Sequence, residues 1–441
     1  MSAVDGSYTP ASRRDAAPGV SSVGGIRVGR VVAAMNDAVV ATLPAAHVGE
    51  GVRIRPRGHP PVLATVARID ENRVRLRALV PLLGIAVGDL VESDPHANSL
   101  ELGISLLGRA VDAAGRPIDG LGHACGRRAS VTPPPIGAAT RTAVSEPFWT
   151  GIRTIDGLLT IGRGARVGIF GGPASGKSTI IEMLAAGARA DAVIVGIVGE
   201  RGREAARWVE RVQGHMTLVV VPSDRPAAER VRGAHVALAQ ASELRRRGLS
   251  VLVILDSLAR FCTAARELAV ANGESVGRGG YPPSVFHEMA LLLERGGNVG
   301  SGSVTLLATV LSDGGDEREP LSDAARATLD GHIVLSTDLA RRGHFPAIDI
   351  LASASRTMSD VAGAEHLRGA ADVRTAIALL EETRDARELG FLQTTPPIER
   401  AVAAREKIDA FLRQSKAAQP PSETLETLRS LAASVRAPDA A

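Results

Sequence analysis

The chain has few aromatic residues, few lysines and almost no cysteine. Aromatic residues make up 2% of its 441 positions, and lysine occurs only at positions 177, 407 and 416. The two cysteines, Cys125 and Cys262, lie far apart and in no spacing typical of a metal site. The sequence therefore predicts two buried or idle thiols in a reducing compartment, with no disulfide framework.

Two further absences concern membranes and nucleic acids. No apolar run approaches the roughly 20 residues that a membrane span needs, and the N-terminus lacks the apolar segment of a signal peptide. We therefore expect a cytoplasmic protein with peripheral membrane association at most. The net charge of +3 is a small excess and does not indicate a nucleic-acid-binding protein.

The sequence does contain a phosphate-binding pattern, within RVGIFGGPASGKSTI (166–180). A short apolar strand is predicted at 166–170 and a helix at 177–189, which is the context that a P-loop requires. Lys177 would contact the β- and γ-phosphates, and the Ser178 hydroxyl would bind Mg²⁺. The alternative is a glycine-rich turn with a chance lysine. The predicted ATP-binding loop consists of Gly171, Gly172, Pro173, Ala174, Ser175, Gly176, Lys177, Ser178 and Thr179.

Acidic residues follow two other predicted strands. Asp256 ends the apolar run VLVILD, and in a P-loop protein such an acid holds magnesium, usually through water. Glu200 and Arg201 follow the strand at 192–198, where a carboxylate can polarise the attacking water and an arginine can neutralise γ-phosphate charge. From spacing alone, a helix cap at Asp256 and a surface ion pair between Glu200 and Arg201 remain alternatives.

The order of predicted elements divides the chain into four parts. Residues 1–25 are rich in Gly, Ser, Ala and Pro and are expected to be a disordered tail. Short strands at 26–97 predict a small β-barrel. Apolar strands alternate with helices at 98–362, which predicts an α/β domain with a parallel sheet covered on both faces. Residues 363–441 are expected to be helical, with helices at 371–389, 397–414 and 422–435.

A set of motifs resembles the type III secretion ATPases, of the virulence or flagellar export kind, which are related to the catalytic subunit of rotary ATP synthases. The resemblance spans about residues 26–414. The motifs are TGIRTIDGLLTIGRG (150–164), GGPASGKST (171–179), GERGRE (199–204), LVILDSLARF (252–261), RGGYPPSVF (278–286), LLERGGN (292–298), LDGHIVLS (329–336), GHFPAIDILASASRTM (343–358) and AFLRQ (410–414). The resemblance implies a RecA-like P-loop NTPase core.

The resemblance also implies a role for each matching residue. Lys177 and Ser178 match the phosphate lysine and the magnesium ligand, and Asp256 matches the acid at the end of a strand that holds magnesium. Glu200 matches the catalytic carboxylate. The other matches are Arg201 with a γ-phosphate contact, Glu204 with an outer magnesium group, Arg295 with an arginine near the phosphates, Phe345 with the aromatic stacked on adenine, and Arg356 with an arginine finger that enters the neighbouring subunit's site.

Family members form homohexamers that use ATP and Mg²⁺ to energise export, releasing chaperones from secreted proteins and unfolding them. The implied partners are a stator protein, hypothesised at residues 1–25, a central stalk protein, an export gate and chaperone–effector complexes. The implied location is the cytoplasmic base of the export apparatus at the inner membrane. Residues 312–320 match the family's pore loop but depart from it in detail.

Three other functions share parts of this pattern. A rotary synthase catalytic subunit would end in an acidic helix-loop instead of AFLRQ. A non-catalytic nucleotide-binding subunit would lack Glu200. A helicase-type motor would have stacking aromatics in its N-terminal barrel, whereas residues 26–97 contain no Phe, Tyr or Trp.

Overall fold

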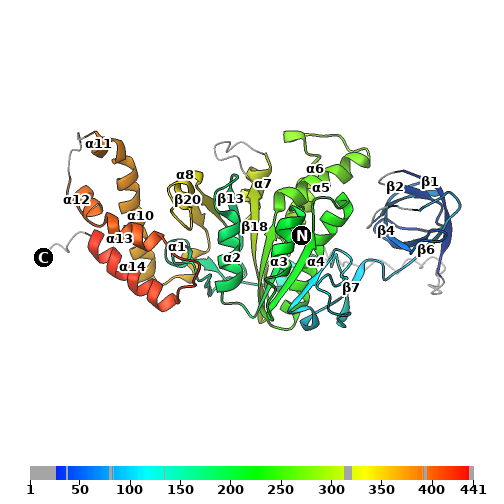
Figure 1. The fold of residues 1–441 in the computed structure, drawn as a ribbon, viewed down its shortest axis with the longest axis horizontal. Coiled ribbons are helices and arrows are strands. Elements are labelled where there is room, and N and C mark those ends of the chain that lie inside the picture. Colours follow the sequence, from blue (N-terminus) through cyan, green and yellow to red (C-terminus); the bar gives the residue numbers. More distant parts are fainter. Residues whose placement is uncertain are drawn as a thin grey trace, which may run out of the picture.

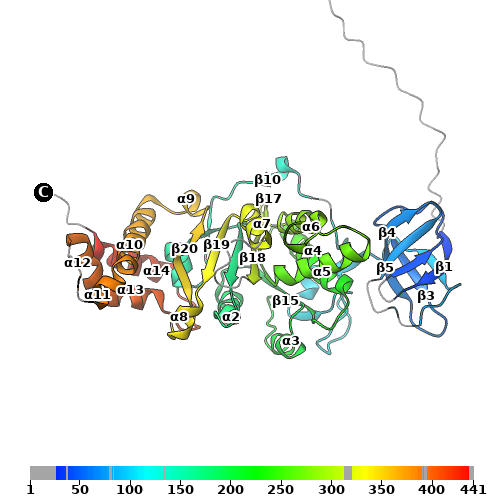
Figure 2. The same ribbon diagram turned by 90° about the horizontal axis from the view of Figure 1, so that it is seen from above.

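The computed structural model describes residues 26–35, 38–78, 82, 84–133, 135–311, 320–389, 391 and 395–436. A small β-barrel, a central sheet flanked by helices and a group of helices follow one another along the long axis of the molecule (Figures 1 and 2). The predicted tail at 1–25, and the predicted pore loop except for residue 320, lie outside the described residues.

Six antiparallel strands close the barrel in the order β1-β2-β5-β4-β3-β6. In β5, Val74, Leu76 and Ala78 are buried while the arginines between them are more exposed, so a period of two separates the barrel core from solvent. The predicted barrel is confirmed. Its strands are β1 (Val28–Ala34), β2 (Ala38–Ala41), β3 (Gly51–Arg55), β4 (Val62–Asp70), β5 (Arg73–Ala78) and β6 (Leu90–Ser93).

The central sheet has the order β20-β19-β13-β18-β16-β14-β15-β8, with β17 and then β10 added beside β18. Neighbours from β19 to β8 are parallel, while β20, β17 and β10 pair antiparallel. The strands are β8 (Arg109–Val111), β10 (Arg141–Thr142), β13 (Arg166–Gly171), β14 (Ala192–Val198), β15 (Met216–Val221), β16 (Ser250–Asp256), β17 (Gly297–Val299), β18 (Gly302–Leu311), β19 (Gly331–Leu335) and β20 (Ile348–Ser355).

Helices cover both faces of this sheet, as its apolar strands predict. Along β14, Val193, Val195 and Ile197 pack into one core, and the alternate residues pack into another. The first core includes α2 (Lys177–Gly187), and the second includes α4 (Ala227–Arg246) and α5 (Leu258–Ala271). The other helices around the sheet are α1 (Arg153–Leu158), α3 (Gly202–Val209), α6 (Pro283–Leu293), α7 (Pro320–Thr328), α8 (Thr337–Arg341) and α9 (Met358–Val361).

Short elements connect the parts. Two-stranded sheets form between β7 (Ser99–Leu102) and β9 (Arg127–Ser130), and between β11 (Pro147–Phe148) and β12 (Ile161–Gly162). Single 3₁₀ turns occur at Ile104–Leu106, Ala138–Thr140 and Arg278–Gly280.

The C-terminal part is helical as predicted, but two predicted helices have the wrong boundaries. The helix predicted at 371–389 begins at Ala364 and ends at Glu382, and a separate short helix follows. Glycine disfavours the interior of a helix, but Gly369 lies inside α10, where α14 packs close to it. The helix predicted at 397–414 is two helices that meet at Ala404. The helices are α10 (Ala364–Glu382), α11 (Arg384–Glu388), α12 (Pro396–Ala403), α13 (Arg405–Leu412) and α14 (Pro421–Val435).

Candidate nucleotide-binding site

The predicted phosphate loop connects the carboxyl end of β13 to the first turn of α2. Its backbone enters the left-handed region at Ala174 (φ 61°) and Gly176 (φ 87°), a conformation that suits glycine and strains alanine. A Cβ at Gly171 would come within 2.6 Å of Ser175 Oγ, so the first glycine leaves room for the loop to fold back. Gly171 and Gly176 therefore allow the tight backbone path of the loop.

The loop has features of an anion-binding site. The first N–H groups of a helix have no partners within the helix, and α2 directs this end at the loop. Ser178 and the loop tip at Pro173 and Ala174 are exposed. The buried Ser175 Oγ has no hydrogen-bond partner among the described residues, so it is a free donor inside the loop. Free donors, an open loop and a helix N-terminus fit a phosphate chain.

Lys177 lies between the two predicted carboxylates. Its Nζ is 3.2 Å from Asp256 Oδ1 and 3.9 Å from Glu200 Oε1. Glu200 is 5% exposed and Asp256 6%. They meet because β13, β14 and β16 are parallel and end at one edge of the sheet, where crevices for ligands form.

Thr309 and Arg260 hold these carboxylates from neighbouring elements. Thr309 Oγ1, on β18, donates a hydrogen bond of 2.6 Å to Asp256 Oδ1. Arg260, on α5, places Nη1 2.9 Å from Glu200 Oε2 and also donates to the carbonyl oxygen of Gly199. Both carboxylates are therefore oriented by groups from other strands or helices.

Burial raises the pKa of Glu200 above its ordinary value, and the negative charge of Asp256 raises it further. The positive charges of Arg260 and Lys177 oppose this shift. A carboxylate with a raised pKa is a better proton acceptor, which suits a group that polarises water.

Arg201 and Glu204 lie next to Glu200 on the exposed side of the site. Arg201 precedes α3 and is exposed, while Glu204 lies in its first turn and is half-buried. The charge of Glu204 contributes to raising the pKa of Glu200, which indicates that the two carboxylates are near neighbours. Both residues are brought to the site, and their predicted roles stay predictions.

Phe345 lies against the P-loop and is 38% exposed. A Cβ at Gly176 would lie 3.2 Å from Phe345 Cε1. The carbonyl oxygen of Phe345 accepts a hydrogen bond of 2.9 Å from the backbone N–H of Gln414. The Gln414 side chain in turn bonds to the backbone of Gly151 and Arg153. The AFLRQ segment thus connects the C-terminal helices to the predicted adenine contact.

Two predicted site residues, Arg356 and Arg295, lie away from the P-loop of their own chain. Arg356 follows β20 and is exposed. The register of the sheet locates it: Ser355 on β20 pairs with Gly331 on β19, and Gly331 pairs with Val167 near the start of β13. Arg356 therefore lies at the opposite edge of the sheet from its own P-loop. Arg295 Nη1 donates to the carbonyl oxygen of Val131 at 3.0 Å, and burial lowers its pKa to about 10.

Arg295 also precedes β17, whose residues pair with the first residues of β18, whereas the P-loop lies beside the last. The structure thus does not bring Arg295 together with the P-loop, and its ATP contact remains a prediction without geometric support.

Comparison with known proteins identifies the family. The family model described as ATP synthase alpha/beta family, nucleotide-binding domain, matches residues 151–355, and the model of the T3SS EscN ATPase C-terminal domain matches residues 362–432. A flagellum-specific ATP synthase of Pseudomonas aeruginosa is 42% identical over 376 residues, covering 82% of this chain and 83% of that protein. The chain belongs to the type III secretion ATPase family.

Other members of this family agree in sequence and fold. The SPI-2 type 3 secretion system ATPase of Salmonella typhimurium is 40% identical over 399 residues, covering 88% of this chain and 91% of that protein. The assembled ATPase EscN of enteropathogenic E. coli has a TM-score of 0.85 and 37% identity, covering 92% of this chain and 100% of that one. The predicted fold class and ATPase activity are confirmed.

The sequence of this secretion ATPase did not lead us to predict two residues of the site, Arg260 and Thr309. Arg260 is the fourth residue after Asp256, within LVILDSLARF, so its position one turn into the helix after a site strand was an available signal. Thr309 lies on β18, and only the register of β18 against β16 shows that it meets Asp256. Among the described residues, no helix is both long and apolar enough to cross a membrane.

Proposed function

We propose that this chain is a Mg²⁺-dependent ATP hydrolase that works as a homohexamer and energises type III protein export. The names of its relatives support the export role. The match of residues 362–432 to the C-terminal domain of EscN favours export over the alternative, a rotary ATP synthase-type catalytic subunit. The observation that most supports a ring is the location of Arg356 at the sheet edge opposite its own P-loop.

The phosphate chain of ATP would bind residues 171–179, with the backbone N–H groups and Lys177 as donors. Lys177 would then turn from Asp256 toward the β- and γ-phosphates, which frees the Asp256 carboxylate. Ser178, Asp256 and more remotely Glu204 would hold Mg²⁺, which when bound neutralises charge on the phosphate oxygens. Phe345 would cover the adenine, because its exposed ring lies beside Gly176.

Glu200 would act as the group that orients and polarises the attacking water. It is buried beside two cations, Lys177 and Arg260, and Arg260 fixes one of its oxygens. Arg201, exposed next to Glu200, would neutralise charge on the γ-phosphate. The described residues of one chain thus provide binding and water activation, and they leave the arginine finger to a neighbour.

Arg356 would complete the site of the adjacent chain. A heterologous interface repeated around a ring brings one edge of each chain to the opposite edge of the next. An arginine finger supplied in trans is worth roughly 10³ to 10⁵ in kcat. A separated chain should therefore hydrolyse ATP slowly.

Further partners follow from the relatives. EscN has been described in complex with its central stalk EscO, which supports a stalk partner for this chain. We further propose a stator protein at residues 1–25, contact with an export gate, release of chaperones from secreted proteins, unfolding of those proteins, and a cytoplasmic position at the base of the export apparatus.

The test measures ATP hydrolysis per chain against protein concentration, with mass from light scattering, for the wild type and Arg356→Ala. The wild-type rate per chain should rise as a six-chain species forms. Arg356→Ala should assemble and bind nucleotide but not turn over. A full rate in a wild-type monomer would contradict the shared site.

A mixing experiment separates a finger in trans from one in cis. Lys177→Ala lacks the phosphate lysine but retains Arg356, and Arg356→Ala has the reverse. Random mixed rings pair the intact P-loop of one variant with the intact arginine of the other at about a quarter of interfaces. We therefore expect the mixture to recover about a quarter of the wild-type activity, whereas a finger that acts in cis predicts no recovery.

A further inference from the structure

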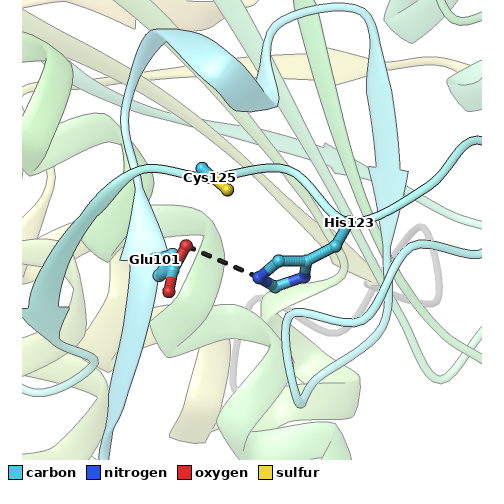
Figure 3. A group of neighbouring side chains, drawn as sticks. All are labelled: Glu101, His123 and Cys125. Carbon is cyan, nitrogen blue, oxygen red and sulfur yellow. Dashed lines mark ion pairs between the residues drawn. The ribbon is translucent and has the colours of Figure 1, made fainter.

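Glu101, His123 and Cys125 form a cluster outside the nucleotide site, and Figure 3 shows the three side chains facing one another. Glu101 belongs to β7, while His123 and Cys125 lie on the segment that leads into β9. One ligand atom from each residue lies within 4.8 Å of the other two. No residue of this cluster belongs to the P-loop site.

The backbone explains why these side chains meet. Ala124 is buried in the core while His123 and Cys125 on either side of it are exposed, so these two side chains project away from the core on the same side of the segment. Beyond Gly126, the chain enters β9, where Arg128 pairs with Glu101. This pairing brings the carboxylate alongside the imidazole and the thiol.

The segment is also held at both ends. Arg109 binds Asp119 through two hydrogen bonds and donates to the carbonyl oxygens of Leu121 and Gly122. At the other end, the backbone N–H of Gly126 donates to Glu101 Oε2 at 3.2 Å. The cluster is therefore built on fixed backbone, although two of its three residues are exposed.

The distances suit ligands of a common ion. His123 Nε2 lies 3.5 Å from Glu101 Oε2. Two ligands at about 2.0 Å from one tetrahedral Zn²⁺ lie about 3.3 Å apart. A thiolate, an imidazole and a carboxylate are a donor set that Zn²⁺ accepts, whereas Mg²⁺ and Ca²⁺ prefer oxygen ligands only.

We propose that Glu101, His123 and Cys125 bind one Zn²⁺, or a divalent ion of similar softness, with the fourth position open to water or to a partner's side chain. Binding replaces the thiol proton of Cys125, which leaves to solvent, with a sulfur–metal bond. The ion would fasten the segment from Asp119 to Gly126 onto β7.

The alternative is an exposed ion pair without a metal. Arg128 Nη2 lies 3.8 Å from Glu101 Oε1, so Glu101 also has a cationic neighbour that competes weakly for its charge. Exposed pairs of this kind stabilise a protein by at most about 1 kcal/mol. An ion pair alone gives no reason for Cys125 to lie beside Glu101 and His123. The reactivity of the Cys125 thiol therefore distinguishes an ion pair from a metal site.

The chain allows a simple measurement because its other thiol is buried. Cys262 is inaccessible and burial raises its pKa, so alkylation of the folded, full-length protein reports on Cys125. We would measure the alkylation rate of the wild-type protein with and without one equivalent of Zn²⁺, in the absence of nucleotide. Bound zinc per chain would be determined by atomic spectroscopy after dialysis.

Zinc should slow alkylation at least tenfold and remain at one ion per chain, and Mg²⁺ should do neither. His123→Ala and Glu101→Gln should each weaken zinc protection by about tenfold or more. His47→Ala, which removes an exposed histidine that pairs with the buried Glu50 outside this cluster, should leave protection unchanged. An alkylation rate that zinc does not alter, or protection equal in all variants, would overturn the proposal.

Discussion

The parallel strands of the central sheet end in two rims, which we call the carboxyl edge and the amino edge after the strand ends that form them. Charged side chains are arranged differently at these two edges. At the carboxyl edge, Lys177, Glu200, Asp256 and Arg260 face one another within one chain. At the amino edge, Arg356 is exposed, and none of the described residues gives its guanidinium a hydrogen bond or an ion pair. The carboxyl edge therefore brings the predicted nucleotide-binding groups together within one chain, whereas the Arg356 side chain is free to contact another molecule.

The amino edge fixes the backbone of Arg356 while leaving its side chain free. Asp330 accepts three hydrogen bonds from Arg166 and, through its carbonyl oxygen, one of 2.9 Å from the N–H of Arg356. The hydrogen bond to Asp330 raises the pKa of Arg166, despite partial burial. A rigid support under a free guanidinium is the arrangement that a group acting on a neighbouring chain requires.

The strongest test of the carboxyl edge is Lys177→Ala. Because Lys177 is the only lysine at the site and would contact two phosphates, nucleotide binding and hydrolysis should both be lost, with turnover down at least about 10³-fold. Fluorescent-nucleotide titration and phosphate release measure the two effects. Lys407→Ala, on the exposed face of α13, is the matched control and should change neither. Normal turnover in Lys177→Ala would disprove the site.

Glu200→Gln should separate binding from chemistry. The amide retains the size of the side chain but cannot polarise water, so nucleotide affinity should stay within a few-fold while kcat falls about 10² to 10⁴-fold. Single-turnover hydrolysis with a parallel binding titration measures this. If kcat remained near the wild-type value, Glu200 would not be the catalytic carboxylate.

The pH profile of the wild type tests the same residue. Glu200 must be ionised to act, and burial raises its pKa. As the pH falls through that raised pKa, the ionised fraction falls, and kcat should drop tenfold per pH unit on an acid limb that lies above the ordinary pKa of a glutamate. This limb should be absent from the residual activity of Glu200→Gln. A limb that persists there belongs to another group.

Arg260→Met should change both the pH dependence of kcat and the turnover rate, by less than Glu200→Gln does. Removing a positive charge 2.9 Å from Glu200 raises the pKa of Glu200 further, so the acid limb of kcat should move to higher pH. Turnover should fall about 10-fold to 100-fold at neutral pH. Arg260→Lys preserves the charge and is the control: its limb should stay near the wild-type pH. Equal limbs in all three proteins would mean that Arg260 does not tune Glu200.

These residues show what the sequence can and cannot predict. Gly171, Gly176 and Lys177 were predictable because a P-loop is local, and its strand and helix adjoin it. Arg260 and Thr309 act across the sheet, so their contacts depend on strand order and register, which the sequence does not state. The helix ends near Thr383 and Ala404 depend on packing among the C-terminal helices. Of the two thiols expected to be buried or idle, Cys262 is buried, whereas Cys125 is exposed next to His123 and Glu101.

Asp330→Asn should have the smallest effect and tests the amino edge alone. The asparagine retains the backbone carbonyl that binds Arg356, but it loses the charge that pairs with Arg166. The free energy of unfolding should fall by about 1 to 2 kcal/mol, measured by urea denaturation. Turnover of the assembled protein should fall only a few-fold, with ATP affinity unchanged, because the P-loop lies at the other edge. Asp338→Asn is the control, since Asp338 and Arg341 are 73% and 76% exposed and their ion pair should contribute almost nothing. A loss of ATP affinity in Asp330→Asn would mean that the two edges are coupled within one chain, and the contrast between them would then fail.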